Sequence, residues 1–227
     1  MKLKEVLQLL QANKNERGIA HWARLGDGTM KSFGLGVTQL RQLGKKIGKD
    51  HKLALELWES DYYDARIIAT IVDDPKLVTP RQVDSQIKGS MFWMLAYAYC
   101  GNLLSRTTFA AEKAGLWVKS KDDLLRRCGY LLLYELAKTD PSWADSYFEP
   151  FLATIAKKLQ SEENFVKDAM NNALFAIGRR SAPLNKRAID IARKIGRVEV
   201  DYGDNSCQAI DCVRHLTSPA LRKKLKS

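Results

Sequence analysis

Three basic side chains stand at one repeated position in the chain, each six residues after a serine. The serine–base pairs are Ser60 and Arg66, Ser120 and Arg126, and Ser161 and Lys167. We expect each serine to cap the N-terminus of a helix, so that the bases recur at one position of successive helices. Bases in such a row could follow the phosphates of a nucleic acid backbone. Alternatively, each base forms a salt bridge with an acid of its own segment.

The four cysteines do not form a metal-binding or disulfide pattern. Cys100 and Cys128 lie in apolar stretches and are predicted to be small core residues. Cys207 and Cys212 lie five residues apart, and His215 follows three residues later. These three side chains are too few for a zinc site, so we expect reduced thiols and no metal.

The composition is that of a folded, basic protein. The chain has 227 residues, of which 45% are hydrophobic and 28% charged, and this mixture excludes a disordered chain. No apolar run reaches the roughly 18 residues of a membrane span, and the N-terminus lacks an export signal, so we expect a cytoplasmic protein without a membrane partner. Lys and Arg number 37 against 26 Asp and Glu, and the net charge of +11 favours a polyanionic partner.

Helical periodicity runs through nearly the whole sequence. Apolar residues recur at three- and four-residue steps in segments such as KLKEVLQLLQA and VTQLRQLGKKI. Thr38 is placed to cap the second of these, while Thr79 and Asp140, each directly followed by proline, mark further helix starts. Only residues 197–203, RVEVDYG, are predicted to be extended.

Internal similarity indicates how these helices are arranged. Each segment around a serine–base pair has an amphipathic helix, the serine, a polar start and a second apolar helix. The spacing between serines is 60 and then 41 residues, and about 40 residues is the size of a two-helix HEAT-type unit. The sequence therefore predicts an all-α fold, an α-solenoid of HEAT-like helical repeats with a basic concave face.

We expect a single domain over residues 1–227. It would comprise an N-terminal helical element (1–33), the repeats (34–216) and a basic tail (217–227). Trp22, in the N-terminal element, could contact DNA or serve as a hydrophobic staple under a loop. The tail could hold phosphates or be a frayed, solvated end.

Several segments together resemble the DNA alkylation repair family, the AlkD-like DNA glycosylases built from HEAT-like repeats. The segments that carry the resemblance, over roughly residues 34–216, are GVTQLRQLGKKIGKDHKLALELWES, ARIIATIVDDP, FAAEKAGLWVKSKDDLLRRCGYLLLYELA, VKDAMNNALFAIG and IGRVEVDYG. The resemblance implies a monomer that binds duplex DNA, including alkylated DNA, in a concave basic cleft. Active members release cationic N3- and N7-alkylpurines and need no metal or cofactor.

The resemblance also implies which residues line the cleft. Trp93 matches the tryptophan that precedes the family's catalytic aspartate by four residues, and the aspartate position then falls on Tyr97. A phenol cannot supply the negative charge that an oxocarbenium-like sugar requires, so no catalytic residue is assigned. Arg126 and Arg127 match the family's arginine motif, and either could meet DNA. With Arg66 and Lys167, these residues form the expected DNA-binding set.

Three functions follow from these observations. The first is a DNA-binding protein related to the alkylpurine glycosylases of base excision repair, without assured excision activity. The second is an active glycosylase, because cationic alkylpurines are labile and need little acid–base assistance. The third is a helical-repeat scaffold for an acidic protein or RNA, since a fold alone does not determine function.

Overall fold

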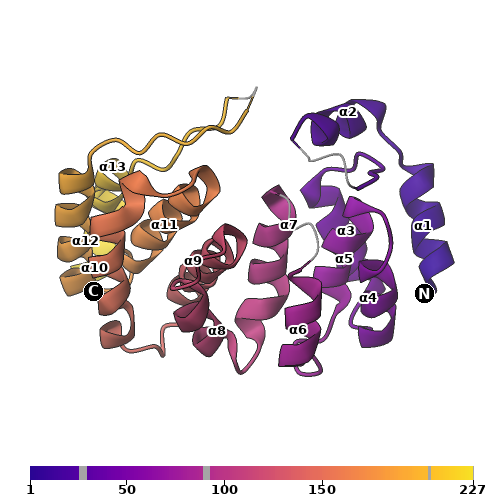
Figure 1. The fold of residues 1–227 in the computed structure, drawn as a ribbon, viewed down its shortest axis with the longest axis horizontal. Helices are drawn as coiled ribbons and strands as arrows, with labels where there is room; N and C mark the ends of the chain where they lie inside the picture. The colour runs from indigo at the N-terminus through magenta and orange to yellow at the C-terminus, as the bar shows by residue number, and fades with distance from the viewer. Residues whose placement is uncertain (26–29, 89–92, 204–205, 227) are drawn as a thin grey trace. The chain divides into compact units, whose positions relative to one another are not determined.

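The computed structural model describes residues 1–25, 30–88, 93–203 and 206–226 of the chain (Figure 1). Helices supply the regular secondary structure, and these ranges contain no β-strand beyond an isolated bridge between Lys31 and Tyr62. The predicted all-α fold is thus confirmed. None of the described helices is long and apolar enough to cross a membrane. The chain divides into two compact units, residues 1–109 and 110–227, which are described in turn.

The first unit is built from short helices around α5. Its helices are α1 (Leu3–Ala12), α2 (Glu16–Leu25), α3 (Val37–Ile47), α4 (His51–Trp58), α5 (Tyr63–Val72), α6 (Pro80–Gln86) and α7 (Trp93–Ala98), followed by a π-helical turn η1 (Tyr99–Leu103) and a 3₁₀ turn η2 (Leu104–Arg106). Helix α5 packs against α3, α4, α7 and η1. Gly44 permits the close approach of α3, because a Cβ atom there would lie 2.8 Å from Ile71 Cγ2.

The second unit is built around the pair α9 and α11. Its helices are α8 (Ala110–Trp117), α9 (Asp123–Thr139), α10 (Asp145–Lys158), η3 (Leu159–Ser161), α11 (Asn164–Ile177), α12 (Ala182–Ile195), α13 (Cys212–Leu216) and α14 (Pro219–Lys226). Helices α9 and α11 share the most extensive packing, and α8 lies against α9. Gly129 brings α9 next to the end of α8, since a Cβ atom there would lie 2.6 Å from the backbone nitrogen of Val118.

Of the three predicted helix starts, one is confirmed and two are wrong. Thr79 caps α6 as predicted: its Oγ1 accepts a hydrogen bond from the backbone N–H of Gln82. The prediction for Thr38 is wrong, because α3 begins at Val37 after Gly36. The prediction for Asp140 is also wrong, because Asp140 follows the end of α9 and binds Ser142 within a turn.

The three repeated serines do not cap helices as predicted. The residues before α5, α9 and α11 are Tyr62, Asp122 and Glu163. Ser60 and Ser120 lie two residues earlier, where each hydroxyl accepts the backbone N–H of the residue two positions on. Ser60 and Ser120 therefore close the turn between paired helices, and acids cap two of the helices that follow the three serines.

The two ends of the chain are both helical. Trp22 of α2 packs on Tyr63 with ring centroids 4.8 Å apart. The connection after α2 is fixed by the buried carboxylate of Asp64, which accepts hydrogen bonds from Ser32 Oγ and from the backbone N–H groups of Phe33 and Leu35. The basic tail forms α14, which buries Leu221.

Candidate nucleic-acid interface

The repeated bases have a structural role in two of the three segments. Arg66 Nε donates to the backbone carbonyl of Ser60 at 3.3 Å, and Arg126 Nη1 donates to that of Ser120 at 3.0 Å. In each case the arginine ties the first turns of a helix to the end of the preceding helix. No corresponding bond joins Lys167 to Ser161 in the described part of the chain. The spacing in the sequence therefore marks a helix-pair connection.

Arg126 is held by carboxylates on two sides. Its guanidinium binds Asp123, one turn earlier in α9, and Glu162, just before α11, with Nη2 to Glu162 Oε2 at 2.8 Å. Burial alone would lower the pKa of Arg126, but the hydrogen bond and charge of Glu162, followed by those of Asp123, raise it. Only 16% of the side chain is exposed. The salt-bridge alternative is thus confirmed for Arg126, with one of its acids in the neighbouring segment.

Arg127 and Lys167 differ in their surroundings. Arg127 is buried, with 6% of its surface exposed, and its guanidinium carbon lies 5.0 Å from the centre of the Phe165 ring on α11. Arg126 and Arg127 therefore both connect α9 to α11. Lys167 is half-buried on α11, and no acid pairs with it in the described ranges. Arg66 lies 5.7 Å from the centre of the Trp58 ring.

The segment aligned with the family's catalytic site lies on α7 and η1. Tyr97 is half-buried on α7 and stands two residues before the π-helical turn. Trp93 begins α7, and its side chain lies outside the described residues. The sequence from Trp93 to Arg106 contains no Asp or Glu. A carboxylate for glycosidic bond cleavage is therefore missing from this segment itself.

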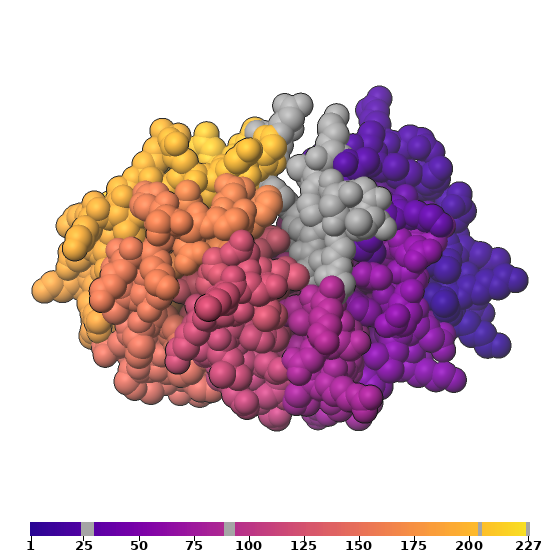
Figure 2. All heavy atoms as spheres, viewed as in Figure 1, coloured from indigo at the N-terminus to yellow at the C-terminus, as the bar shows by residue number. Residues whose placement is uncertain are grey.

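Amide side chains attach the long connection between α12 and α13 to the rest of the second unit. Residues 196–203 form an outgoing leg that leaves the end of α12, and residues 206–211 form a returning leg that leads into α13 (Figure 1). Asn164 pairs with the backbone of Asp201 through two hydrogen bonds of 2.6 and 2.8 Å. Gln160 donates to the carbonyl of Ile195, at the end of α12, and to that of Arg197 on the outgoing leg, and Asn171 donates to Ile210 on the returning leg. In the space-filling view yellow residues of the C-terminal part of the chain lie over orange residues that precede them in the sequence (Figure 2).

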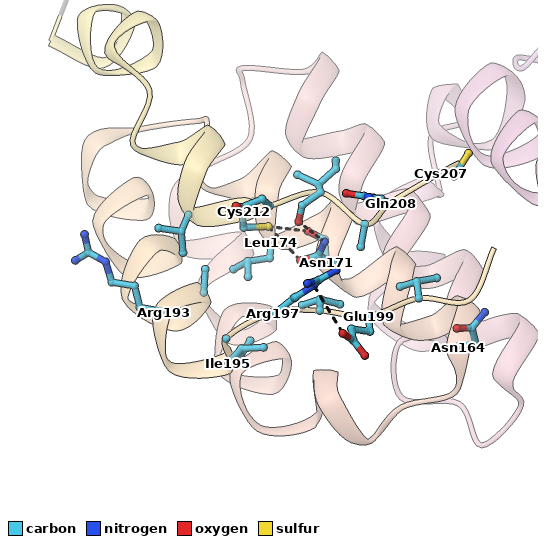
Figure 3. A pocket seen from close by; sticks show the side chains of 18 of the residues that line it. Asn164, Asn171, Leu174, Arg193, Ile195, Arg197, Glu199, Cys207, Gln208 and Cys212 are labelled. Atoms are coloured by element: carbon cyan, nitrogen blue, oxygen red, sulfur yellow. Dashed lines mark hydrogen bonds and ion pairs between the residues drawn. The ribbon is translucent and has the colours of Figure 1, made fainter. Parts of the chain in front are cut away.

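A cavity of about 1040 Å³ opens between the two legs and α11. Figure 3 shows Asn171 and Cys212 meeting on one side of it, and Arg197 paired with Glu199 on the outgoing leg. The Cys212 thiol contacts Asn171 Oδ1 at 3.1 Å, and burial, with a contribution from Asp211, raises its pKa to about 12. Cys207 is exposed. Cys212 is therefore a buried thiol that keeps its proton.

Asp168 of α11 binds the outgoing leg through Tyr202. It is 5% exposed, and its Oδ1 accepts hydrogen bonds from Tyr202 Oη at 2.6 Å and Asn172 Nδ2 at 3.2 Å. Burial, the hydrogen bond and the Asp168 charge all raise the pKa of Tyr202. Asp168 and Asn171, polar residues of an otherwise apolar helix, therefore bind the 196–211 segment, and Asn172 bonds Asp168 within the helix.

The sequence reasoning missed a cluster of bases in the first unit. Arg41, Lys45, Lys49 and Arg106 surround a pocket of about 410 Å³ between α3, the end of α5 and the η1–η2 turns. A local signal was available, since residues 41–52 hold five Lys or Arg and a single acid. The contribution of Arg106 depends on packing between distant segments, which no local pattern reveals.

Comparisons with known proteins agree with this architecture. The chain is 26% identical to the protein Lin0241 of Listeria innocua over 91% of this chain and 92% of that protein. It is 24% identical to Lmo0209 of Listeria monocytogenes, over 95% and 96% of the two chains. A solved structure with a TM-score of 0.85 and 27% identity covers 99% of this chain and is covered to 96% itself.

That structure is described as a new family of proteins related to the HEAT-like repeat DNA glycosylases, with affinity for branched DNA structures. The predicted HEAT-like repeat fold is therefore confirmed. The family model for DNA alkylation repair enzymes matches residues 6–202. This chain belongs to the DNA alkylation repair enzyme family.

Proposed function

We propose that this protein binds DNA through backbone phosphates, with a preference for branched DNA, and does not excise bases. The observation that carries the proposal is the similarity, along nearly the whole chain, to a solved protein with affinity for branched DNA. Branched DNA consists of duplex arms, so the expectation of duplex binding is retained within the proposal. The net charge of +11 supports it, because a basic protein releases condensed counterions when it binds DNA.

The chemistry of excision supports the second half of the proposal. Cleavage of a glycosidic bond develops positive charge on the sugar, which a nearby carboxylate stabilises. Tyr97 occupies the aligned position, and a neutral phenol offers a hydrogen bond without that charge. Asp168 and Glu162, carboxylates of the second unit, are already bound to Tyr202 and Arg126. We therefore assign these carboxylates to structure.

Binding is tested by fluorescence anisotropy with a labelled four-way junction and a linear duplex of the same arm length, at several salt concentrations. We expect tighter binding of the junction and an affinity that falls steeply as salt rises. Equal affinity for the two probes would remove the branched-DNA preference. No binding, or binding indifferent to salt, would overturn the proposal.

Excision is tested by incubating the protein with methylated DNA and measuring released 3- and 7-methylpurines by chromatography. We expect release at the spontaneous rate. The variant Tyr97→Asp restores a carboxylate at the aligned position, and a gain in release would support the alignment. Release above the spontaneous rate by the unmodified protein would contradict the proposal and establish the glycosylase alternative.

A further inference from the structure

Four basic side chains and no acidic one line the pocket of the first unit. The lining consists of Arg41, Gly44, Lys45, Gly48, Lys49, Ile71, Asn102 and Arg106. Arg41 and Lys45 lie one helical turn apart on α3, so their side chains leave the same face of the helix. Arg106 approaches from η2, which is distant in sequence. The fold thus brings positive charge from two separate segments to one place.

Glycines give the pocket its shape. The close contact of Gly44 with Ile71 sets the floor, because a Cβ atom on Gly44 would lie only 2.8 Å from Ile71 Cγ2. Gly48 ends α3 with a φ of 80°, a left-handed conformation that favours glycine. The turn at Gly48 directs the chain so that Lys49 reaches the end of α5. A Cβ atom on Gly48 would meet nothing within 4 Å, so the space beside it is open.

Lys49 already has partners. Its Nζ donates to the carbonyls of Ile71 at 2.8 Å and Asp73 at 2.6 Å, which lie at the negative end of α5. Burial and then the charge of Arg106 lower the pKa of Lys49, although Asp74 and Asp73 oppose this effect. Arg106 is therefore near enough to repel Lys49. The positive charge of Lys49 offsets the carbonyls, which would otherwise disfavour an anion in the pocket.

The remaining bases are available to a ligand. Arg41, Lys45 and Arg106 are exposed, and none of them forms an ion pair in the described part of the chain. Asn102 adds an amide group, which donates to Thr70 Oγ1 at 2.9 Å. Two guanidinium groups and an ammonium group that line one pocket without a carboxylate match a phosphate, which offers several acceptor oxygens and negative charge.

We infer that this pocket binds a backbone phosphate of DNA. This inference rests on the proposed function and adds a contact site to it. A phosphodiester fits better than a free phosphorylated metabolite because the three available bases are exposed. They can reach a phosphate that remains part of a strand. The pocket lies at the end of α5 opposite Arg66, so it is separate from the row of bases that the serine spacing suggested.

The test compares two double variants that each remove two positive charges from the first unit. Arg41→Gln with Arg106→Gln changes the pocket. Lys4→Gln with Arg17→Gln changes exposed side chains on α1 and α2. Junction affinity is measured against salt for both variants and for the unmodified protein. We expect the pocket variant to bind roughly tenfold more weakly than the control variant, with a log–log salt slope smaller by about 1, the contribution of one phosphate contact.

Equal losses in the two variants, while the unmodified protein binds DNA, would overturn the inference and leave the proposed function standing. An unmodified protein that binds no DNA would overturn both. Inorganic phosphate and adenosine diphosphate are titrated in parallel by calorimetry. Micromolar binding of either to the unmodified protein, lost in the pocket variant while junction affinity stays equal in the two variants, would assign the pocket to a small phosphorylated ligand and overturn the DNA assignment.

Discussion

Arg126 of the second unit and the pair Arg41 and Arg106 of the first unit have opposite surroundings. Arg126 of the second unit lies between Asp123 and Glu162 with little exposure to solvent. Arg41 and Arg106 of the first unit line a pocket with no acidic neighbour in its lining. A base that the protein has already paired with carboxylates must break those bonds to hold a phosphate. The comparison shows that a base at a repeated position, such as Arg126, can stabilise the fold, while exposed bases without an acidic partner among the described residues lie at other positions, such as Arg41 and Arg106.

The largest expected difference is in stability. Arg126→Ala leaves Glu162, whose side chain is only 10% exposed, without its partner, so we expect the free energy of unfolding to fall by about 3 kcal/mol. Arg41→Ala removes an exposed, unpaired base and should change it by less than about 0.5 kcal/mol. Urea unfolding followed by circular dichroism measures both. Similar losses of unfolding free energy in the two variants would contradict the distinction between an arginine that stabilises the fold and an exposed arginine without an acidic partner.

Gly44 in the first unit and Gly129 in the second each allow two helices to pack closely, and their substitution should have different effects on stability. Gly129→Ala would place a Cβ atom against backbone atoms of α8, which cannot rotate away, and we expect a loss of about 2 kcal/mol. Gly44→Ala would meet the Ile71 side chain, which can shift in part, so a smaller loss follows. Thermal unfolding of the two variants gives the order. A larger loss for Gly44→Ala would contradict this account of the helix contacts.

Alkaline pH should destabilise the second unit. Burial raises the pKa of Tyr130 and that of Tyr147 to about 12, and the pKa of Tyr202 is also raised. Each phenol therefore keeps its proton in the folded chain at a pH where the unfolded chain has lost it. This contribution is complete below about pH 10 and is lost as pH rises above that value. We expect the free energy of unfolding to fall by roughly 1 kcal/mol for each of these phenols between pH 9 and 11, or about 3 kcal/mol in all.

The variant Tyr130→Phe isolates one of these groups. It removes the ionisable hydroxyl from a fully buried ring, so its stability should decline less with pH than that of the unmodified protein. Urea unfolding at a series of pH values measures the difference. An identical decline in the two proteins would show that Tyr130 makes no contribution.

The smallest predicted effect concerns the 196–211 segment. Asn164→Ala removes both hydrogen bonds to Asp201, and we expect a loss of about 1 kcal/mol. The outgoing leg should then be cleaved faster in limited proteolysis, with cuts located by mass spectrometry. Asn13→Ala, which loses a bond to Leu9 on α1, is a control that should not alter cleavage there. Unchanged cleavage in Asn164→Ala would mean that other contacts hold the leg.

The sequence predicted the fold well because its signals are local. Helical periodicity and the Thr79-Pro80 start need only neighbouring residues, and both agree with the structure. The errors at Thr38 and Asp140 arose where a glycine and a turn decided the boundary. The serine–base spacing does recur in the structure, but it reflects hydrogen bonds that join paired helices, from Arg66 to Ser60 and from Arg126 to Ser120, and not helix capping by the serines.

The site was less predictable because it depends on contacts between distant segments. The partnership of Arg126 with Glu162 crosses 36 residues, and nothing near Arg126 in the sequence indicates it. Arg106 reaches the pocket of Arg41 only through the packing of η2 beside α3 and α5. Asp168 and Asn171 of α11 likewise bind partners more than 30 residues away, on the 196–211 segment, so their role cannot be predicted from the local sequence.

The central claim is that DNA is held by the available bases and not by the paired ones. One experiment tests this claim: the wild-type protein is treated with phenylglyoxal, which reacts with arginine, in the presence and absence of a four-way junction. The arginines that have reacted are then located by mass spectrometry. The account predicts that Arg41 and Arg106 react in the free protein and are protected by DNA, while Arg126 reacts little in either state. Arg41 and Arg106 reacting equally in both states, or Arg126 reacting readily in the free protein and becoming protected by DNA, would contradict the account.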